Sequence, residues 1–238
     1  MEITIAYLYP DLLNLYGDRG NILSLKKRCE DRKIKTCVKN YFIGESIDFE
    51  NIDILYIGGG TDRNQELALK AINPIKEDLI NYAENDGVIL AVCGGFEMLG
   101  KSLASSGTEG LSLLNIEPQK GRTGIVGNII TRNEELGFDI VGFENHIGRI
   151  ELSGYSPLGK VVYGTGNNDK KEYEGIIYKN VIGTYIHGPL LPKNPLLADY
   201  IIKKTLEKKY REINLKKLND DWENKAHDYI IQKYGSQK

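Results

Sequence analysis

Cys93 is the residue of this 238-residue chain with the clearest potential for chemistry. It follows an apolar run, residues 87–92, and directly precedes Gly94 and Gly95. A strand that turns sharply through small residues into a helix can present its terminal side chain as a nucleophile elbow. The helix N-terminus favours thiolate over thiol. A following glycine lets a substrate carbonyl approach backbone N–H groups. The pattern predicts a nucleophilic cysteine, with a purely structural buried cysteine as the alternative.

A nucleophilic cysteine needs a base, and the chain contains three histidines. His187 ends an apolar segment and precedes Gly-Pro, which predicts a position at the same carboxyl edge of a sheet as Cys93. We therefore expect His187 to be the base. His146 follows Phe-Glu-Asn and remains an alternative for which a structural role is favoured. His227 lies in a charged tail and is expected to be a surface residue.

A tetrahedral intermediate of acyl transfer needs hydrogen-bond donors for its oxyanion. Gly58, Gly59 and Gly60 follow the apolar segment 52–57, so their backbone N–H groups are expected at the carboxyl edge of the sheet. Gly94 would supply a second donor from the elbow. A glycine triplet alone also fits a tight turn or a phosphate-binding loop. Together with the cysteine, it indicates an oxyanion hole.

The elements that must position these residues alternate through the first hundred residues. We expect strands at 3–9, 34–38, 52–57 and 87–92, with helices at 21–33 and at 64–85, the latter broken near Pro74. This alternation of strands and helices predicts an α/β fold with a doubly wound, mostly parallel sheet flanked by helices.

After Gly100 the sequence becomes rich in glycine and in short β-branched runs. Residues 125–131, 138–143 and 161–163 predict added antiparallel strands, and 181–187 predicts a last strand that ends at His187. The segment from about 196 to 238 is charged and helical in pattern, which is typical of a solvated helix face. Without a repeat or linker, we expect one domain over residues 1–238.

Composition excludes several classes of protein. With 41% hydrophobic and 27% charged residues and a net charge of −2, nothing indicates nucleic-acid or membrane binding. The three cysteines form no disulfide or zinc pattern, which favours a reducing cytoplasm and no metal site. No signal peptide or spanning segment is evident. Neither a P-loop nor a dinucleotide-binding motif is present, so we expect no cofactor in this chain.

Four motifs resemble those of the cobyric-acid-synthase-like class I glutamine amidotransferases. They are Ile-Gly-Gly-Gly-Thr-Asp-Arg (57–63), Val-Cys-Gly-Gly-Phe (92–96), Gly-Phe-Glu-Asn-His-Ile-Gly-Arg (142–149) and Gly-Thr-Tyr-Ile-His-Gly-Pro-Leu-Leu-Pro-Lys-Asn-Pro (183–195). Leu-Asn-Leu-Tyr-Gly-Asp-Arg-Gly-Asn (13–21) is also similar. The resemblance spans nearly the whole chain and implies a flavodoxin-like core.

Within this family the chain is similar to the small glutaminase subunits of lipid II isoglutaminyl synthases. The resemblance implies that Cys93 is the nucleophile, that His187 is the base, and that Gly59 or Gly60 with Gly94 forms the oxyanion hole. Arg122 is the best match to the arginine that binds substrate glutamine.

The resemblance also implies a partner. Ammonia would pass to a Mur-ligase-like, ATP-dependent subunit (MurT type) in a heterodimer, which amidates D-glutamate of the lipid II stem peptide during peptidoglycan synthesis. ATP and Mg²⁺ would bind to that partner. The first strand begins at Ile3, which favours separate subunits over the single-chain arrangement of cobyric acid synthases. The alternatives are another acceptor, such as a corrinoid carboxylate, and a non-catalytic scaffold subunit with a relict site.

The chain departs from the wider amidotransferase pattern beside the base. The usual His-x-Glu pair is absent because Gly188 and Pro189 follow His187. A base without an orienting carboxylate has a poorly fixed tautomer. We therefore expect the partner subunit to lend an acidic side chain.

Overall fold

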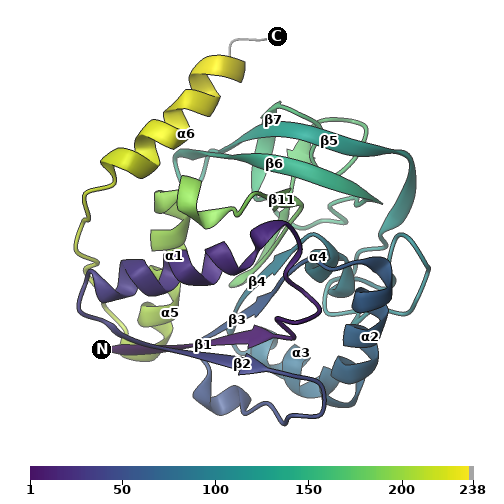
Figure 1. Cartoon of the computed structure of the whole chain (residues 1–238), viewed down its shortest axis with the longest axis horizontal. Coiled ribbons are helices and arrows are strands. Elements are labelled where there is room, and N and C mark those ends of the chain that lie inside the picture. Colours follow the sequence, from purple (N-terminus) through teal and green to yellow (C-terminus); the bar gives the residue numbers. More distant parts are fainter. Residues whose placement is uncertain (236–238) are drawn as a thin grey trace.

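The computed structural model describes residues 1–235 and has two sheets that share one core (Figure 1). The six-stranded sheet has the order β2-β1-β3-β4-β10-β9, in which only β9 is antiparallel to its neighbour. Its strands are β1 (Glu2–Leu8), β2 (Lys35–Tyr41), β3 (Ile54–Ile57), β4 (Val88–Val92), β9 (Ile176–Tyr178) and β10 (Val181–Thr184). The predicted doubly wound, mostly parallel sheet is confirmed.

Helices cover both faces of this sheet. In Figure 1, α1 and α5 lie on one side of the parallel strands, and α2 and α3 lie on the other. The helices are α1 (Arg19–Glu30), α2 (Asp62–Ile72), α3 (Lys76–Glu84), α4 (Gly94–Met98), α5 (Pro195–Tyr210) and α6 (Asp221–Tyr234). The expected break near Pro74 is confirmed, because a short 3₁₀ turn, Asn73–Ile75, separates α2 from α3. Proline lacks the N–H that a continuous helix would need there.

The second sheet is antiparallel, as expected for the region after Gly100. Its order is β11-β6-β5-β7-β8. The strands are β5 (Gln119–Asn133), β6 (Phe138–Arg149), β7 (Gly159–Tyr163), β8 (Tyr173–Glu174) and β11 (Ile186–His187). The single strand expected at 181–187 is wrong, because this segment forms two short strands in different sheets. Thr184 ends β10 in the parallel sheet, and Ile186 begins β11 in the antiparallel sheet.

The charged tail is helical, as predicted, but it is not simply solvated. Helix α5 buries one face, including Leu197, Ile201 and Leu206, and it packs against α1. Helix α6 has no buried residue and follows the non-helical segment 211–220. Figure 1 shows α6 extending beside the antiparallel sheet.

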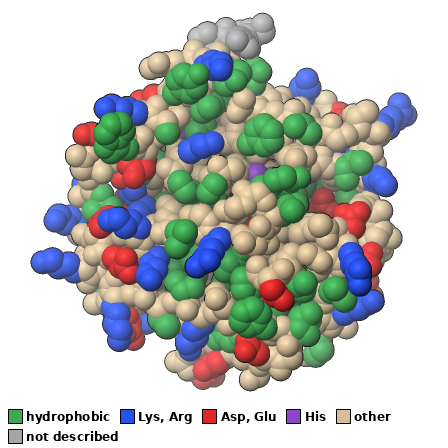
Figure 2. Space-filling view, viewed as in Figure 1, with side chains coloured by type: hydrophobic (Ala, Val, Ile, Leu, Met, Phe, Trp, Pro, Cys, Tyr) green, Lys and Arg blue, Asp and Glu red, His purple; other side chains and the backbone are tan. Residues whose placement is uncertain are grey.

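On the face shown in Figure 2, acidic and basic side chains are intermixed, and apolar side chains lie between them. Within the described residues, no helix is both long and apolar enough to span a membrane. The same part of the chain contains no group of three histidine, cysteine or acidic side chains that could bind a metal ion.

Candidate active site

Neighbouring parallel strands deliver the predicted site residues to one edge of the sheet. Gly58 follows β3, Cys93 follows β4, and the chain after β10 leads directly to His187. Strands β4 and β10 are paired in register up to Val92 and Thr184, and the Cys93 N–H donates to the Thr184 carbonyl at 2.7 Å. Ligands bind at this carboxyl edge in open α/β sheets.

Cys93 has the backbone conformation of a nucleophile elbow. Its φ of 54° and ψ of −112° lie in a region that residues other than glycine rarely adopt. The glycines after it allow close packing. A Cβ on Gly94 would lie 2.4 Å from the Gln65 side chain, and one on Gly95 would lie 2.4 Å from the Ile57 carbonyl oxygen. The predicted sharp turn from strand into helix is therefore present.

Gly59 lies between the cysteine and the histidine. A Cβ placed on Gly59 would be 3.3 Å from both Cys93 Cβ and His187 Cε1. The structure thus brings Cys93, His187 and the glycine triplet together. His187 is buried, and its Nε2 has no hydrogen-bond partner within residues 1–235.

Burial opposes the expected thiolate character of Cys93. Burial raises the pKa of the Cys93 thiol well above its ordinary value, and the nearby carboxylates of Glu97 and Asp18 raise it further. A hydrogen bond from the Gly94 N–H lowers the pKa only slightly against these effects. Desolvation and the two carboxylates therefore favour the neutral thiol in the resting site.

The structure separates the two glycines expected as alternative oxyanion donors, Gly59 and Gly60. The Gly59 N–H donates to Asp18 Oδ2 at 2.7 Å, so it is already occupied. Gly60 is therefore the better candidate of those two. The third predicted donor, Gly94, directs its N–H at the Cys93 sulfur in the resting site.

Asp18 is the residue of the site that sequence reasoning missed. Its side chain is fully buried, and its Oδ1 lies 3.4 Å from His187 Nδ1. A carboxylate from another segment of the chain thus lies beside the base, although the residues directly after His187 supply none. That the partner subunit lends an acidic side chain stays a prediction. The available signal was an acidic residue in the 13–21 motif, which follows β1 at the same sheet edge.

The other candidates lie apart from the base. Arg122 is exposed on β5, and no hydrogen bond or ion pair ties it to Cys93 or His187 within the described residues. His227 is half-buried on α6, and its Nδ1 is 2.9 Å from the Lys193 carbonyl oxygen.

His146 is buried and stacks on Tyr185, with ring centroids 3.8 Å apart. Its Nδ1 is 2.9 Å from the Gly148 carbonyl, which can only accept, so Nδ1 carries the proton. Burial lowers the pKa of His146 to about 4. His146 is therefore a neutral, buried ring packed on Tyr185, in keeping with the structural role favoured for it.

Comparison with known proteins identifies the family. Residues 4–195 match the CobB/CobQ-like glutamine amidotransferase domain. The chain is 40% identical to the GatD subunit of the glutamine-hydrolyzing lipid II isoglutaminyl synthase of Staphylococcus aureus N315, covering 100% of this chain and 98% of the relative. It is 42% identical to the GatD subunit from Streptococcus pneumoniae R6, covering 88% and 82%. Cobyric acid synthase of Listeria innocua is 33% identical over 62% of this chain but only 30% of its own length.

Two solved structures share the fold. A glutamine amidotransferase crystal structure matches with a TM-score of 0.56 and 14% identity, covering 84% of this chain and 98% of that chain. The glutaminase domain of Trypanosoma brucei CTPS with bound acivicin matches with a TM-score of 0.51 and 9% identity, covering 90% and 96%. The predicted class I amidotransferase-like fold is confirmed. The chain belongs to the CobB/CobQ-like glutamine amidotransferase family, in the group formed by the GatD subunits.

Proposed function

We propose that this chain is a glutaminase subunit that hydrolyses L-glutamine to glutamate and ammonia with Cys93 and His187. The observation that carries the proposal is the position of Gly59, which lies against both side chains at the carboxyl edge of the sheet. Acyl transfer to sulfur requires a nucleophile, a base and backbone donors close together, as they are at this edge of the sheet.

In the proposed mechanism, His187 Nε2 takes the thiol proton as the Cys93 sulfur attacks the side-chain amide carbon of glutamine. The raised pKa of Cys93 makes this transfer necessary, because the resting sulfur is protonated. The N–H groups of Gly60 and Gly94 stabilise the oxyanion. His187 then protonates the departing nitrogen, ammonia leaves, and water hydrolyses the thioester to glutamate.

We propose that Arg122 binds the carboxylate of the substrate glutamine. It lies where the pairing of β5 with β6 shifts between Lys120 and Ile125. A bulge of this kind can re-aim side chains near an active site. The Arg149 guanidinium supports the bulge by donating to the Thr123 carbonyl at 2.9 Å.

We further propose that the ammonia passes to an ATP-dependent, Mur-ligase-like partner of the MurT type in a heterodimer. The partner would bind ATP and Mg²⁺ and amidate D-glutamate of lipid II in the cytoplasm. Near-complete coverage of the S. aureus GatD subunit supports this over a corrinoid acceptor, since the chain spans only 30% of the L. innocua cobyric acid synthase.

The proposal is tested with Cys93→Ala and His187→Ala in the complex with the partner. Both variants should lose glutamine-dependent amidation to below detection, because nucleophile or base is missing. Both should keep ammonium-dependent amidation, because the partner's chemistry is untouched. His227→Ala, on α6, is the matched control and should retain both activities. Glutamine use by Cys93→Ala would reject the mechanism.

A further inference from the structure

We propose that Asp18 is the positioning residue of this site. Its one carboxylate fixes both the tautomer of His187 and the glycine loop 58–60, called the oxyanion loop below. This inference rests on the proposed glutaminase function and deepens it. It assigns to the chain itself the orienting carboxylate that the residues after His187 do not supply.

The two carboxylate oxygens of Asp18 have separate partners. Oδ2 accepts the Gly59 N–H at 2.7 Å, and Oδ1 lies 3.4 Å from His187 Nδ1. An ionised carboxylate only accepts hydrogen bonds, so the proton of neutral His187 belongs on Nδ1. This leaves Nε2 with its lone pair, as a base requires. The 3.4 Å separation is long, but catalytic hydrogen bonds often tighten only when substrate binds.

The backbone around Asp18 is built for this contact. Tyr16 and Gly17 have φ values of 56° and 80°, so the chain turns through two left-handed residues directly before Asp18. The Leu15 N–H donates to the Gly59 carbonyl at 3.0 Å, which ties the segment to the oxyanion loop. The Tyr16 ring meets the His187 ring edge-on at 5.0 Å. Asp18 is therefore held against both groups by its own segment.

The start of α1 is also fixed to the loop after His187. A Cβ on Gly20 would lie 2.3 Å from Pro189 Cγ, so only glycine permits this approach. Asn21 Oδ1 accepts the Leu191 N–H at 2.8 Å. The motifs 13–21 and 183–195 thus pack together as one unit, with Asp18 and His187 at its centre.

Asp18→Asn tests the positioning role without disturbing the packing, because asparagine has the same shape as aspartate. The Gly59 N–H needs an acceptor, so the new amide oxygen takes the place of Oδ2. The amide NH₂ then faces His187 Nδ1 and donates to it, which moves the imidazole proton to Nε2. In serine proteases the equivalent tautomer change lowers kcat about 10⁴-fold. We expect a loss of glutamine hydrolysis of about 10³- to 10⁴-fold in kcat, with KM nearly unchanged.

The tautomer itself is read by NMR of the full chain labelled with ¹⁵N-histidine, which is simple because there are three histidines. The His187→Ala spectrum assigns its signals. The unmodified chain should show His187 protonated on Nδ1, and Asp18→Asn should show it protonated on Nε2. Asp11→Asn, at an exposed aspartate before the same segment, is the matched control and should change neither the tautomer nor the hydrolysis rate.

Several results would overturn the proposal. One is a His187 of the unmodified chain protonated on Nε2, a measurement that needs no variant to fold. Another is an Asp18→Asn protein that hydrolyses glutamine within about threefold of the unmodified rate. If the unmodified chain and its complex do not hydrolyse glutamine at all, the proposed function fails, while the tautomer still decides the role of Asp18.

Discussion

Cys93 has an energetically unfavourable backbone conformation, which places it for its proposed chemistry. Left-handed backbone at a residue with a side chain costs on the order of 1–3 kcal/mol and persists only where neighbours enforce it. Here the enforcing contacts are the hydrogen bond from the Cys93 N–H to Thr184 and the close approach of Gly95 to Ile57. The turn takes Cys93 out of the sheet to a position beside Gly59, which also lies against His187.

Burial of Cys93 predicts low reactivity toward simple alkylating agents. With iodoacetamide at neutral pH, the exposed Cys37 should be labelled first, and Cys93 much more slowly because its resting thiol is protonated. The buried Cys29, whose pKa burial raises to about 11, should stay unlabelled. Peptide mass spectrometry over time gives the order. Labelling of Cys93 ahead of Cys37 would contradict the neutral thiol.

A glutamine-analogue electrophile should reverse that order. The analogue brings its reactive carbon to Cys93 and lets His187 remove the thiol proton, so Cys93 should be the only cysteine modified. His187→Ala is the control and should suppress this labelling.

At the residue scale, the positions of the reactive side chains could be predicted from the sequence, but their protonation states could not. Cys93 and His187 could be located because each ends an apolar strand. The thiol's pKa could not be predicted, because it depends on burial and on carboxylates from other segments. Asp18 was missed because it lies 169 residues from His187 and meets it only through folding.

At the scale of elements, the split between β10 and β11 was beyond prediction. Residues 181–187 form one apolar run, and nothing in it marks Tyr185 as the crossing point between sheets. The crossing is stabilised by Glu174, which accepts hydrogen bonds from the Tyr185 N–H at 2.7 Å and the Thr184 hydroxyl at 2.9 Å. The helices and strands of the first hundred residues were predictable because their hydrophobic periods are local.

The buried Glu174 predicts a pH-dependent stability. Burial raises the pKa of Glu174 to about 8, so the folded chain keeps its proton where the unfolded chain has lost it. The stability from the neutral carboxyl is therefore fully present below about pH 4.5 and is lost as the pH rises through 8. The total is roughly 5 kcal/mol, at about 1.4 kcal/mol for each pKa unit between 4.5 and 8.

Glu174→Gln tests this directly, because the amide keeps an acceptor and cannot ionise. Urea unfolding of both proteins at several values from pH 6 to 9 should show the variant gaining stability relative to the unmodified chain as the pH rises. The relative measure cancels other titrating groups, such as His146, whose lowered pKa acts between about pH 4 and 6.5. Parallel pH profiles for the two proteins would contradict the neutral carboxyl.

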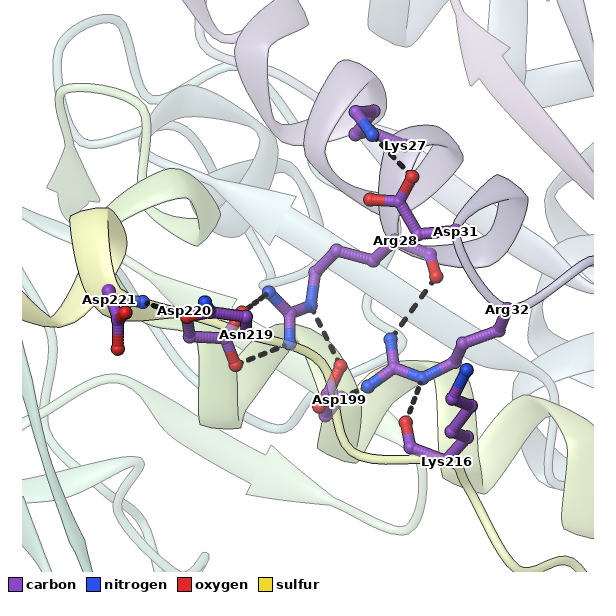
Figure 3. Close-up of polar contacts among 9 residues, drawn as sticks. All are labelled: Lys27, Arg28, Asp31, Arg32, Asp199, Lys216, Asn219, Asp220 and Asp221. Carbon is purple, nitrogen blue, oxygen red and sulfur yellow. Dashed lines mark hydrogen bonds and ion pairs between the residues drawn. The ribbon is translucent and has the colours of Figure 1, made fainter.

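At the scale of the whole molecule, ion pairs join the first helix to the last segment. Figure 3 shows Arg28 of α1 and Arg32, in the turn just after α1, facing Asp199 of α5 and Asp220 before α6. Arg28 donates to Asp199 at 2.7 Å and to both oxygens of Asp220 at 2.6 and 3.0 Å. Arg32 donates to Asp199 and to the Lys216 carbonyl, each at 2.6 Å. The charge pattern of the tail predicted a helix but could not predict these distant partners.

This cluster predicts what holds residues 211–234 in place. Because α6 has no fully buried residue, we expect the Arg28–Asp220 pair at its start to be a main attachment, beside the His227 contact to Lys193 and the Tyr163–Tyr234 ring contact. Arg28→Met keeps the apolar stem but leaves Asp220 without its buried cation. Breaking a buried pair in this way costs about 3 kcal/mol. The segment 211–220 should then be cut far faster in limited proteolysis than in the unmodified chain.

Arg132→Met, which breaks an exposed pair with Asp139, is the control. It should leave the cleavage rate unchanged and change the free energy of unfolding by no more than about 0.5 kcal/mol. Equal cleavage of the Arg28→Met and Arg132→Met proteins would show that the Arg28–Asp220 pair does not hold α6 in place.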